Sequence, residues 1–201
     1  MEIKDKTKDI LLKKILKEPL IEHTATNLAK ELKITRQAVW KILKKLSNEN
    51  LIILKSIAET KKSANKIGLN YKNPLIEKTL SLILIKESLN YERWRVNFAE
   101  LKDNASFIIL FGSILNNPKE ANDIDIILVV KNKQGFHIVN KNILKIQQTQ
   151  LKKIHNLDLT KNELIAELKG QNKAYLDALK KGVILYGQEN FVDFIKNLQT
   201  K

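Results

Sequence analysis

Phe107-Ile-Ile-Leu-Phe-Gly-Ser113 and Asn122-Asp-Ile-Asp-Ile-Ile-Leu-Val-Val130 are two short apolar segments separated by a polar loop. Their length and composition are typical of strands. Side chains alternate between the two faces of a strand, so Asp123 and Asp125 are predicted to point to the same side. Two convergent carboxylates are costly unless a cation screens them, and a hard cation such as Mg²⁺ prefers oxygen ligands.

Gly112 and Ser113 close the first of these segments. A glycine lets the backbone approach a ligand closely, and a serine offers a hydroxyl group and an N–H to a phosphate. Together with the two aspartates, this pair predicts metal-assisted phosphoryl chemistry. The Gly-Ser pair and the two aspartates each have a simpler explanation when taken alone. Gly-Ser is common in turns, and Asp-x-Asp is common at the solvent-exposed start of a strand. The prediction therefore depends on both halves occurring together.

Gly112-Ser113, the nine residues 114–122, and then Asp-hydrophobic-Asp-hydrophobic resemble the signature of the polymerase-β-type nucleotidyltransferases, especially the minimal ones of prokaryotes. The resemblance implies that Gly112 and Ser113 hold the triphosphate of a nucleoside triphosphate, and that Asp123 and Asp125 bind two Mg²⁺ ions. It also implies a third carboxylate on a later strand, for which Asp158 is the matching candidate. An in-line displacement gains from two cations, which activate the incoming oxygen and stabilise the departing pyrophosphate.

The loop between the two strands departs from the family pattern. Many minimal members carry a small residue and a Gly or Arg shortly after Gly-Ser, and a Ser just before the first Asp. Ile114-Leu-Asn-Asn-Pro118 and Asn122 stand in those places here. The departure leaves the metal ligands intact and puts the loop's hold on the nucleotide in question.

Composition excludes several classes of protein. The chain has 201 residues, of which 43% are hydrophobic, and no apolar run approaches the roughly 18 residues of a membrane span. The first residues form no apolar signal segment and there is no cysteine, so we expect a cytoplasmic protein without disulfides. The three histidines, His23, His137 and His155, are scattered, which argues against a zinc site.

The net charge of +14 is unevenly distributed. Residues 1–73 hold 17 Lys+Arg against 8 Asp+Glu, whereas residues 74–201 hold 19 against 14. A basic excess concentrated in one part of a chain favours a polyanionic partner such as nucleic acid. The alternative is biased codon usage, since the chain is rich in Lys, Ile and Asn.

The N-terminal third shows the periodicity of three helices followed by two strands. Helices are predicted over residues 6–17, from Thr24 to Leu32, and from Thr35 to about Leu46, with the two threonines as N-caps. Two short helices joined by a tight turn, the second of them basic, indicate a helix-turn-helix. Residues 50–57 and 66–71 are predicted to form a β-hairpin wing.

Residues 5–72 resemble a winged helix-turn-helix, and Thr35-Arg-Gln-Ala-Val-Trp-Lys41 is close to the recognition helix of biotin-repressor-type members. The resemblance implies that the third helix enters the major groove of double-stranded DNA. Arg36 and Gln37 are the candidates for base edges, and the lysines would contact phosphates. A winged helix used for protein contacts is the alternative. The candidate DNA-binding residues are Thr35, Arg36, Gln37, Lys41, Lys44, Lys61 and Lys62.

The whole chain is predicted to have an α/β (α+β) fold with three parts. Residues 1–73 form the winged helix, and residues 105–201 a nucleotidyltransferase domain with a mixed sheet. Residues 74–104 form the connector, predicted as one long helix or as two joined near Asn90. The order of strands and helices favours helices on one face of that sheet. The connector has more apolar residues than one buried stripe needs, and by analogy with winged-helix regulators we expect a homodimer.

Two hypotheses about function follow. In the first, the protein is a DNA-binding regulator whose second domain uses Mg²⁺ and a nucleoside triphosphate to transfer a nucleotide to a protein or RNA. In the second, the transferase fold is degenerate and serves nucleotide sensing or oligomerisation. A weaker alternative is a transferase that uses its winged helix on RNA. The position of Asp158 separates the first two, because a location on the opposite face of the sheet would defeat the two-metal mechanism.

Overall fold

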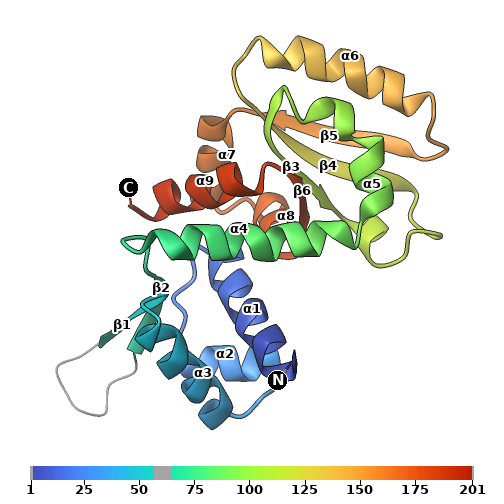
Figure 1. Cartoon of the computed structure of the whole chain (residues 1–201). Helices are drawn as coiled ribbons and strands as arrows, with labels where there is room; N and C mark the ends of the chain where they lie inside the picture. The colour runs from blue at the N-terminus through green and yellow to red at the C-terminus, as the bar shows by residue number, and fades with distance from the viewer. Residues whose placement is uncertain (1, 57–64, 201) are drawn as a thin grey trace. The chain divides into compact units, whose positions relative to one another are not determined.

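The computed structural model describes residues 2–56 and 65–200 (Figure 1). The chain divides into two compact units, Met1–Leu80 and Ser81–Lys201, and each is described by itself. Lys61 and Lys62, two of the predicted DNA contacts, lie outside the described residues.

In its described residues, the first unit contains three whole helices, one antiparallel strand pair and the first half of α4 (Pro74–Leu89). Thr24 and Thr35 accept hydrogen bonds from the backbone N–H of Asn27 and Ala38, so both predicted N-caps are confirmed. Lys33 adopts a left-handed conformation (φ 54°) and ends the second helix. The elements are α1 (Glu2–Lys17), α2 (Ala25–Leu32), α3 (Arg36–Asn48), β1 (Ile52–Ser56) and β2 (Asn65–Leu69).

The core of this unit comes from one apolar stripe on each helix. These stripes arise because apolar residues recur every three or four positions and so share one side of a helix. The antiparallel β1–β2 pair lies beside them, and His23 forms an isolated bridge to Ile67. The fully buried residues are Leu11, Leu12, Leu16, Leu28, Val39, Leu43 and Leu46.

The second unit is built around four strands. Its helices include the second half of α4, which ends at Leu89, and a short helix follows, so the predicted connector is two helices. The elements are α4 (Pro74–Leu89), α5 (Glu92–Asn97), β3 (Ala105–Phe111), β4 (Asp123–Val130), α6 (Gly135–Gln147), β5 (Lys153–Leu159), α7 (Lys161–Lys169), α8 (Lys173–Lys181), β6 (Val183–Tyr186) and α9 (Gln188–Thr200).

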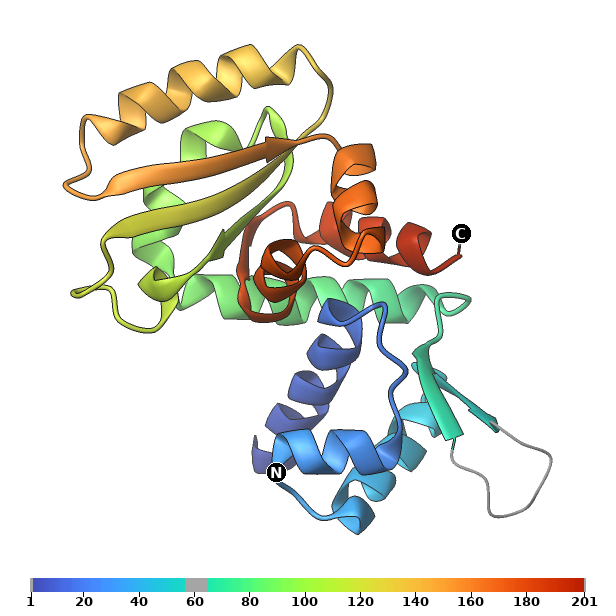
Figure 2. The same cartoon turned by 180° about the vertical axis from the view of Figure 1, so that it is seen from behind.

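The sheet has the strand order β5-β4-β3-β6 (Figure 2). β4 and β5 are parallel, and β3 pairs antiparallel with both β4 and β6. The sheet is therefore mixed, and the predicted α/β (α+β) fold class of this part is confirmed. The crossover that parallel pairing requires is supplied by α6, which connects β4 to β5.

Helices cover both faces of this sheet, so the prediction of helices on one face was wrong. On one face, Ile126 and Leu128 pack in a core cluster that includes Val139 of α6. On the other face, Phe107 contacts both Phe191 and Phe194 of α9, with ring centroids 5.4 Å apart in each pair. The physical reason is visible in β4, where every residue from 126 to 130 is buried. A strand buried on both sides needs a layer of helices on each.

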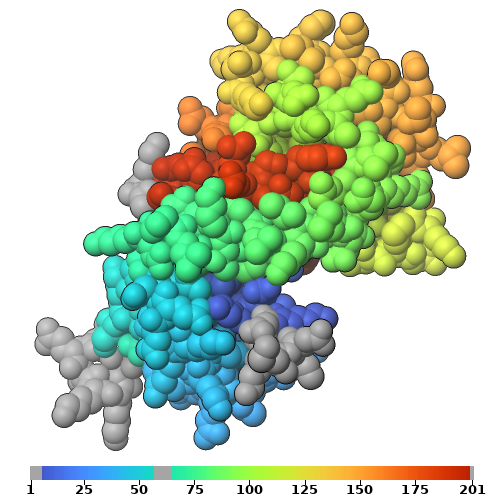
Figure 3. Space-filling model, viewed as in Figure 1, coloured from blue at the N-terminus to red at the C-terminus, as the bar shows by residue number. Residues whose placement is uncertain are grey.

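The outer side of α4 carries apolar residues that remain exposed. Leu82 and Leu89 are 51% and 53% exposed, and α4 lies at the surface in the view of Figure 3 (green). The expected homodimer remains a prediction, with this row of side chains as the place to test it. Within the described residues, no helix is both long and apolar enough to cross a membrane.

His23 makes the stability of the first unit depend on pH. Its ring is 3% exposed, and Nε2 donates to the Glu18 carbonyl oxygen at 3.2 Å. Burial lowers the pKa of His23 below its ordinary value of 6.5, and the hydrogen bond to Glu18 only partly opposes this. Below pH 6.5 the unfolded chain binds a proton at His23 more readily than the folded unit does. The contribution of His23 to stability is therefore fully present above pH 6.5 and is lost as the pH falls.

We therefore expect the urea midpoint of this unit to be constant above about pH 6.5 and to fall as the pH is lowered below about 6.5. Trp40 fluorescence in a Trp94→Phe background reports this unit, because the chain has one tryptophan in each unit. His23→Gln should remove the slope in that window, whereas His137→Gln, at an exposed position, should keep it. An unchanged slope in His23→Gln would contradict the assignment.

Candidate active site at the start of β4

Asp123 is the first residue of β4 and Asp125 is the third. Their side chains point to the same side of the strand, as their spacing predicted. The parallel pairing with β5 places His155 directly beside Asp125 on this face. His155 Nδ1 is 3.2 Å from Asp123 Oδ2 and 3.6 Å from Asp125 Oδ1. Three side chains from two adjacent strands thus converge on one point.

The donor set of this cluster fits a divalent cation. One ligand atom from each of Asp123, Asp125 and His155 lies within 4.8 Å of the others. Two carboxylate oxygens and one imidazole nitrogen are ordinary ligands of divalent metals. The side chains are partly exposed, at 32%, 24% and 46% respectively, so an ion has a path from solvent. The arrangement can hold a cation without a change of fold.

The carboxylate of Asp125 is held in an unfavourable environment. Burial raises its pKa, and the negative charge of Asp123 raises it further, while the charge and hydrogen bond of His155 act in the opposite direction. A positive charge placed between the carboxylates would relieve this cost. The electrostatics of the site thus agree with its donor set.

Gly112 fixes the position of the Asp125 side chain. Its backbone has φ +83° and ψ −165°, a region open essentially to glycine alone. A Cβ at this position would lie 2.2 Å from Asp125 Oδ2. The carboxylate therefore packs directly against the glycine backbone, and the same residue both turns the chain and leaves room for the site.

The loop from Ser113 to Asn122 is anchored at both ends. Ile114 and Ala121 are 1% and 4% exposed and belong to the core cluster. The ammonium group of Lys152 donates to the carbonyl oxygens of Ala121 and, at 3.3 Å, of Lys119. Ile114, which departs from the family pattern in sequence, is thus a core residue, while Ser113 remains exposed beside Gly112.

Residues 96–190 match the family model described as "Polymerase beta, Nucleotidyltransferase". This part of the chain is similar to the polymerase-β-type nucleotidyltransferases. The match indicates nucleotidyl transfer at the level of the family, whose members typically use a divalent metal ion. No curated protein and no solved structure matches the chain.

Asp158 does not join Asp123 and Asp125, and this prediction is corrected. It pairs with Leu128, which faces the α6 side of the sheet, so Asp158 lies on the face opposite to Asp125. Its Oδ2 accepts a hydrogen bond from Asn156 at 2.9 Å. Its Oδ1 is buried without a hydrogen-bond partner among the described residues, and burial raises its pKa.

His155 takes the place where the third carboxylate was expected, and sequence reasoning missed it. Asp158 was chosen by residue type, on the assumption that the family pattern holds. Strand parity shows only that Asp158 and His155 face opposite sides of the strand, since they lie an odd number of positions apart. The register that pairs His155 with Asp125 was not visible in the sequence.

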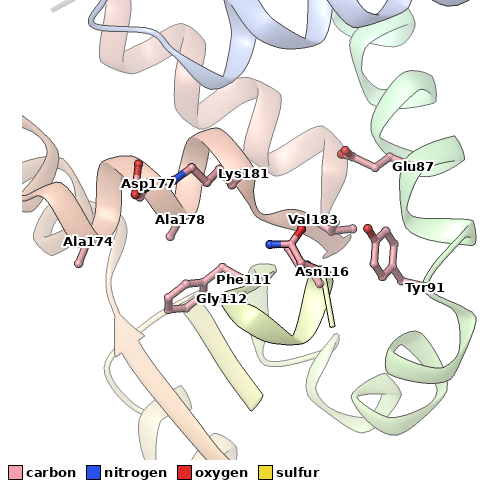
Figure 4. Close-up of a pocket in the computed structure, with 11 residues that line it drawn as sticks. Glu87, Tyr91, Phe111, Gly112, Asn116, Ala174, Asp177, Ala178, Lys181 and Val183 are labelled. Carbon is pink, nitrogen blue, oxygen red and sulfur yellow. Dashed lines mark hydrogen bonds and ion pairs between the residues drawn. The ribbon is translucent and has the colours of Figure 1, made fainter. Parts of the chain in front are cut away.

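A cavity of about 460 Å³ opens next to Gly112 (Figure 4). The loop residue Asn116 forms one side, and Asp177 and Lys181 of α8 form another. Tyr91 closes a third side with its ring. A small molecule in this cavity would therefore contact the same glycine that packs against Asp125.

In the first unit, the predicted DNA contacts that the structure describes lie on one helix and its cap. Thr35 precedes α3, and Arg36 and Gln37 form its first turn. Lys41 and Lys44 follow on the same helix, and all five residues are exposed. Lys61 and Lys62 remain outside the described residues, and the DNA contacts remain predictions.

Gly112→Ala should disable the site of the nucleotidyltransferase domain. The backbone strain costs about 1–3 kcal/mol, and the added Cβ must displace the Asp125 carboxylate. We expect the affinity for a divalent cation to fall by at least about tenfold, measured by calorimetry. Gly68→Ala is the matched control, because a Cβ there meets nothing within 4 Å. Unchanged cation affinity in a folded Gly112→Ala protein would contradict the role of this glycine.

Proposed function

We propose that the second unit binds a nucleoside triphosphate at Gly112 and transfers its nucleotide to a hydroxyl group of a protein or RNA. The observation that carries this proposal is the convergence of the Asp123 and Asp125 carboxylates beside a glycine whose backbone is open to a ligand. The match of residues 96–190 to the nucleotidyltransferase family supports it independently.

Each part of the site has a distinct role in this proposal. Asp123 and Asp125 hold a divalent cation, and the backbone and hydroxyl group of Gly112-Ser113 bind the triphosphate. The cavity beside Gly112 takes the nucleoside, with the Tyr91 ring and the Asn116 amide on its walls. Two Mg²⁺ ions were predicted from the sequence. Because Asp158 lies outside the site, we propose a single cation held by the protein.

The reaction is an in-line displacement at the α-phosphorus. The acceptor hydroxyl attacks, its proton passes to solvent, a new P–O bond forms, and the bond to pyrophosphate breaks. A bound divalent cation would supply neutralisation of the triphosphate and of the leaving pyrophosphate. The loop contributes orientation, since Ile114, Ala121 and Lys152 fix it against the sheet.

Asp125→Asn and Asp158→Asn test this proposal as a matched pair. The purified chain is incubated with each labelled nucleoside triphosphate, a divalent cation and cell lysate, and transfer of label is measured. We expect Asp125→Asn to lower transfer by at least about a hundredfold, because it removes charge at the reacting phosphates. Asp158→Asn should keep transfer close to wild type, since that side chain faces away from the site. Equal loss in both variants would contradict the assignment.

Nucleotide sensing without transfer is the second candidate. It is favoured by the position of Asp158 on the opposite face of the sheet, which defeats the two-metal mechanism and leaves the Asp123–Asp125–His155 group without a third carboxylate. A sensor would bind labelled nucleoside triphosphate in an Asp125-dependent way and release it unchanged, with no label on any lysate component. The same incubation separates the two functions, because it records binding and transfer together.

We propose that the first unit binds double-stranded DNA through α3. Arg36 and Gln37 are exposed in the first turn of this helix, where side chains of a recognition helix reach base edges. Lys41 and Lys44 are exposed further along and suit phosphate contacts. The basic excess of residues 1–73 supports a polyanionic partner.

Substitutions on α3 should separate base contacts from phosphate contacts. Arg36→Ala is expected to cost about 1–3 kcal/mol at one base position and so relax sequence preference. Lys44→Ala should weaken binding to all sequences evenly and lower the salt slope by about one. Lys141→Ala, an exposed lysine of the second unit, is the control. Binding to selected and random duplexes across a salt series measures both effects, and an affinity independent of salt would contradict the phosphate contacts.

A further inference from the structure

His155, and not a third carboxylate, joins Asp123 and Asp125 in the site. Its register partner is Asp125, so its side chain cannot turn away from the site without breaking the pairing of β4 with β5. Nδ1 is the nearer ring nitrogen to both carboxylates, at 3.2 Å and 3.6 Å. The ring is therefore held with one nitrogen directed at the point where the carboxylates converge.

The spacing of these atoms is that of a first coordination shell. Ligands bonded to one metal at about 2.0–2.2 Å lie roughly 3 Å apart when they are adjacent. The distance from His155 Nδ1 to Asp123 Oδ2, 3.2 Å, is already close to this value. The Asp125 oxygen is 3.6 Å from the same nitrogen, and the three ligand atoms lie within 4.8 Å of one another, so a bound ion would draw them closer together.

We propose that His155 is a direct metal ligand through Nδ1, and that the site consequently prefers Mn²⁺ and other first-row transition ions over Mg²⁺. Mg²⁺ takes oxygen ligands, whereas imidazole nitrogen suits transition metals. The inference deepens the proposed function, because it concerns the cation of that same site. It also gives the departure from a third carboxylate a chemical meaning.

The test is a comparison of metal affinities in the full chain without nucleotide. Mn²⁺ and Mg²⁺ are titrated separately by calorimetry into the wild type, His155→Asp and the control His137→Asp, which changes an exposed histidine of α6. An added carboxylate raises affinity for both ions by its charge, so the ratio of the two affinities is the readout. We expect His155→Asp to lower the Mn²⁺ to Mg²⁺ ratio by about tenfold or more and His137→Asp to leave it unchanged.

A second measurement detects the bond itself. The chain has three histidines, so the ring nitrogens of a histidine-labelled sample give few NMR signals. With Cd²⁺ as a probe, a directly bonded nitrogen splits through cadmium–nitrogen coupling, which a hydrogen bond to a bound water cannot produce. We expect this splitting for His155 Nδ1 and not for His137.

The outcomes distinguish failure of this inference from failure of the proposed function. If Asp123→Asn abolishes metal binding while His155→Asp leaves the ratio unchanged and no cadmium coupling appears, His155 is not a ligand and the inference is overturned alone. If the wild type binds neither ion, or Asp123→Asn binds as the wild type does, the metal site itself is absent. Both proposals are then overturned.

Discussion

The parallel pairing of β4 with β5 determines what this site contains. Paired residues of adjacent strands share a face, so the register that joins Asp125 to His155 also joins Leu128 to Asp158. The Asp158 carboxylate is thereby directed to the α6 side of the sheet. The His155 imidazole is directed to the side that carries Asp123 and Asp125. A shift of one residue would reverse every side chain of β5. The buried residue Ile154, which must face the core cluster, prevents that shift.

Sequence reasoning succeeded where a local rule decides the outcome. The threonine caps, the two central strands and the convergence of Asp123 with Asp125 each follow from a few neighbouring residues. Reasoning failed where the outcome depends on pairing between distant segments. The choice of Asp158 followed residue type, whereas its true neighbours depend on a register that local pattern does not encode. The layer of helices on the second face was missed although the unbroken apolar run of β4 indicates it.

The residues at which the loop departs from the family pattern affect how the loop is attached to the core, as well as how it would bind a nucleotide. Ile114 replaces a small residue and contributes a buried side chain to the core cluster, and Ala121 does so at the other end. Lys152, immediately before β5, holds the loop through two carbonyl oxygens. Rigid attachment lowers the conformational entropy that a bound nucleotide would otherwise have to remove from the loop. Under the proposed function, the loop would position a phosphate through its backbone without the small residues that many minimal nucleotidyltransferases carry.

The replacement of a carboxylate by an imidazole also changes the charge of the site. The charge of two carboxylates is balanced by one divalent cation, whereas three carboxylates repel one another more strongly and call for two. Without a metal, a site with two carboxylates carries less repulsion than a site with three. The binding of a triphosphate would be weaker, because a site whose charge is already neutralised attracts the negative triphosphate less. Lys181, beside the cavity, is paired with Asp177 at 2.9 Å, and Lys152 is engaged by the loop. Nucleotide affinity in this domain must accordingly depend more on backbone geometry at Gly112 and on the fit of the nucleoside in the cavity than on surplus positive charge.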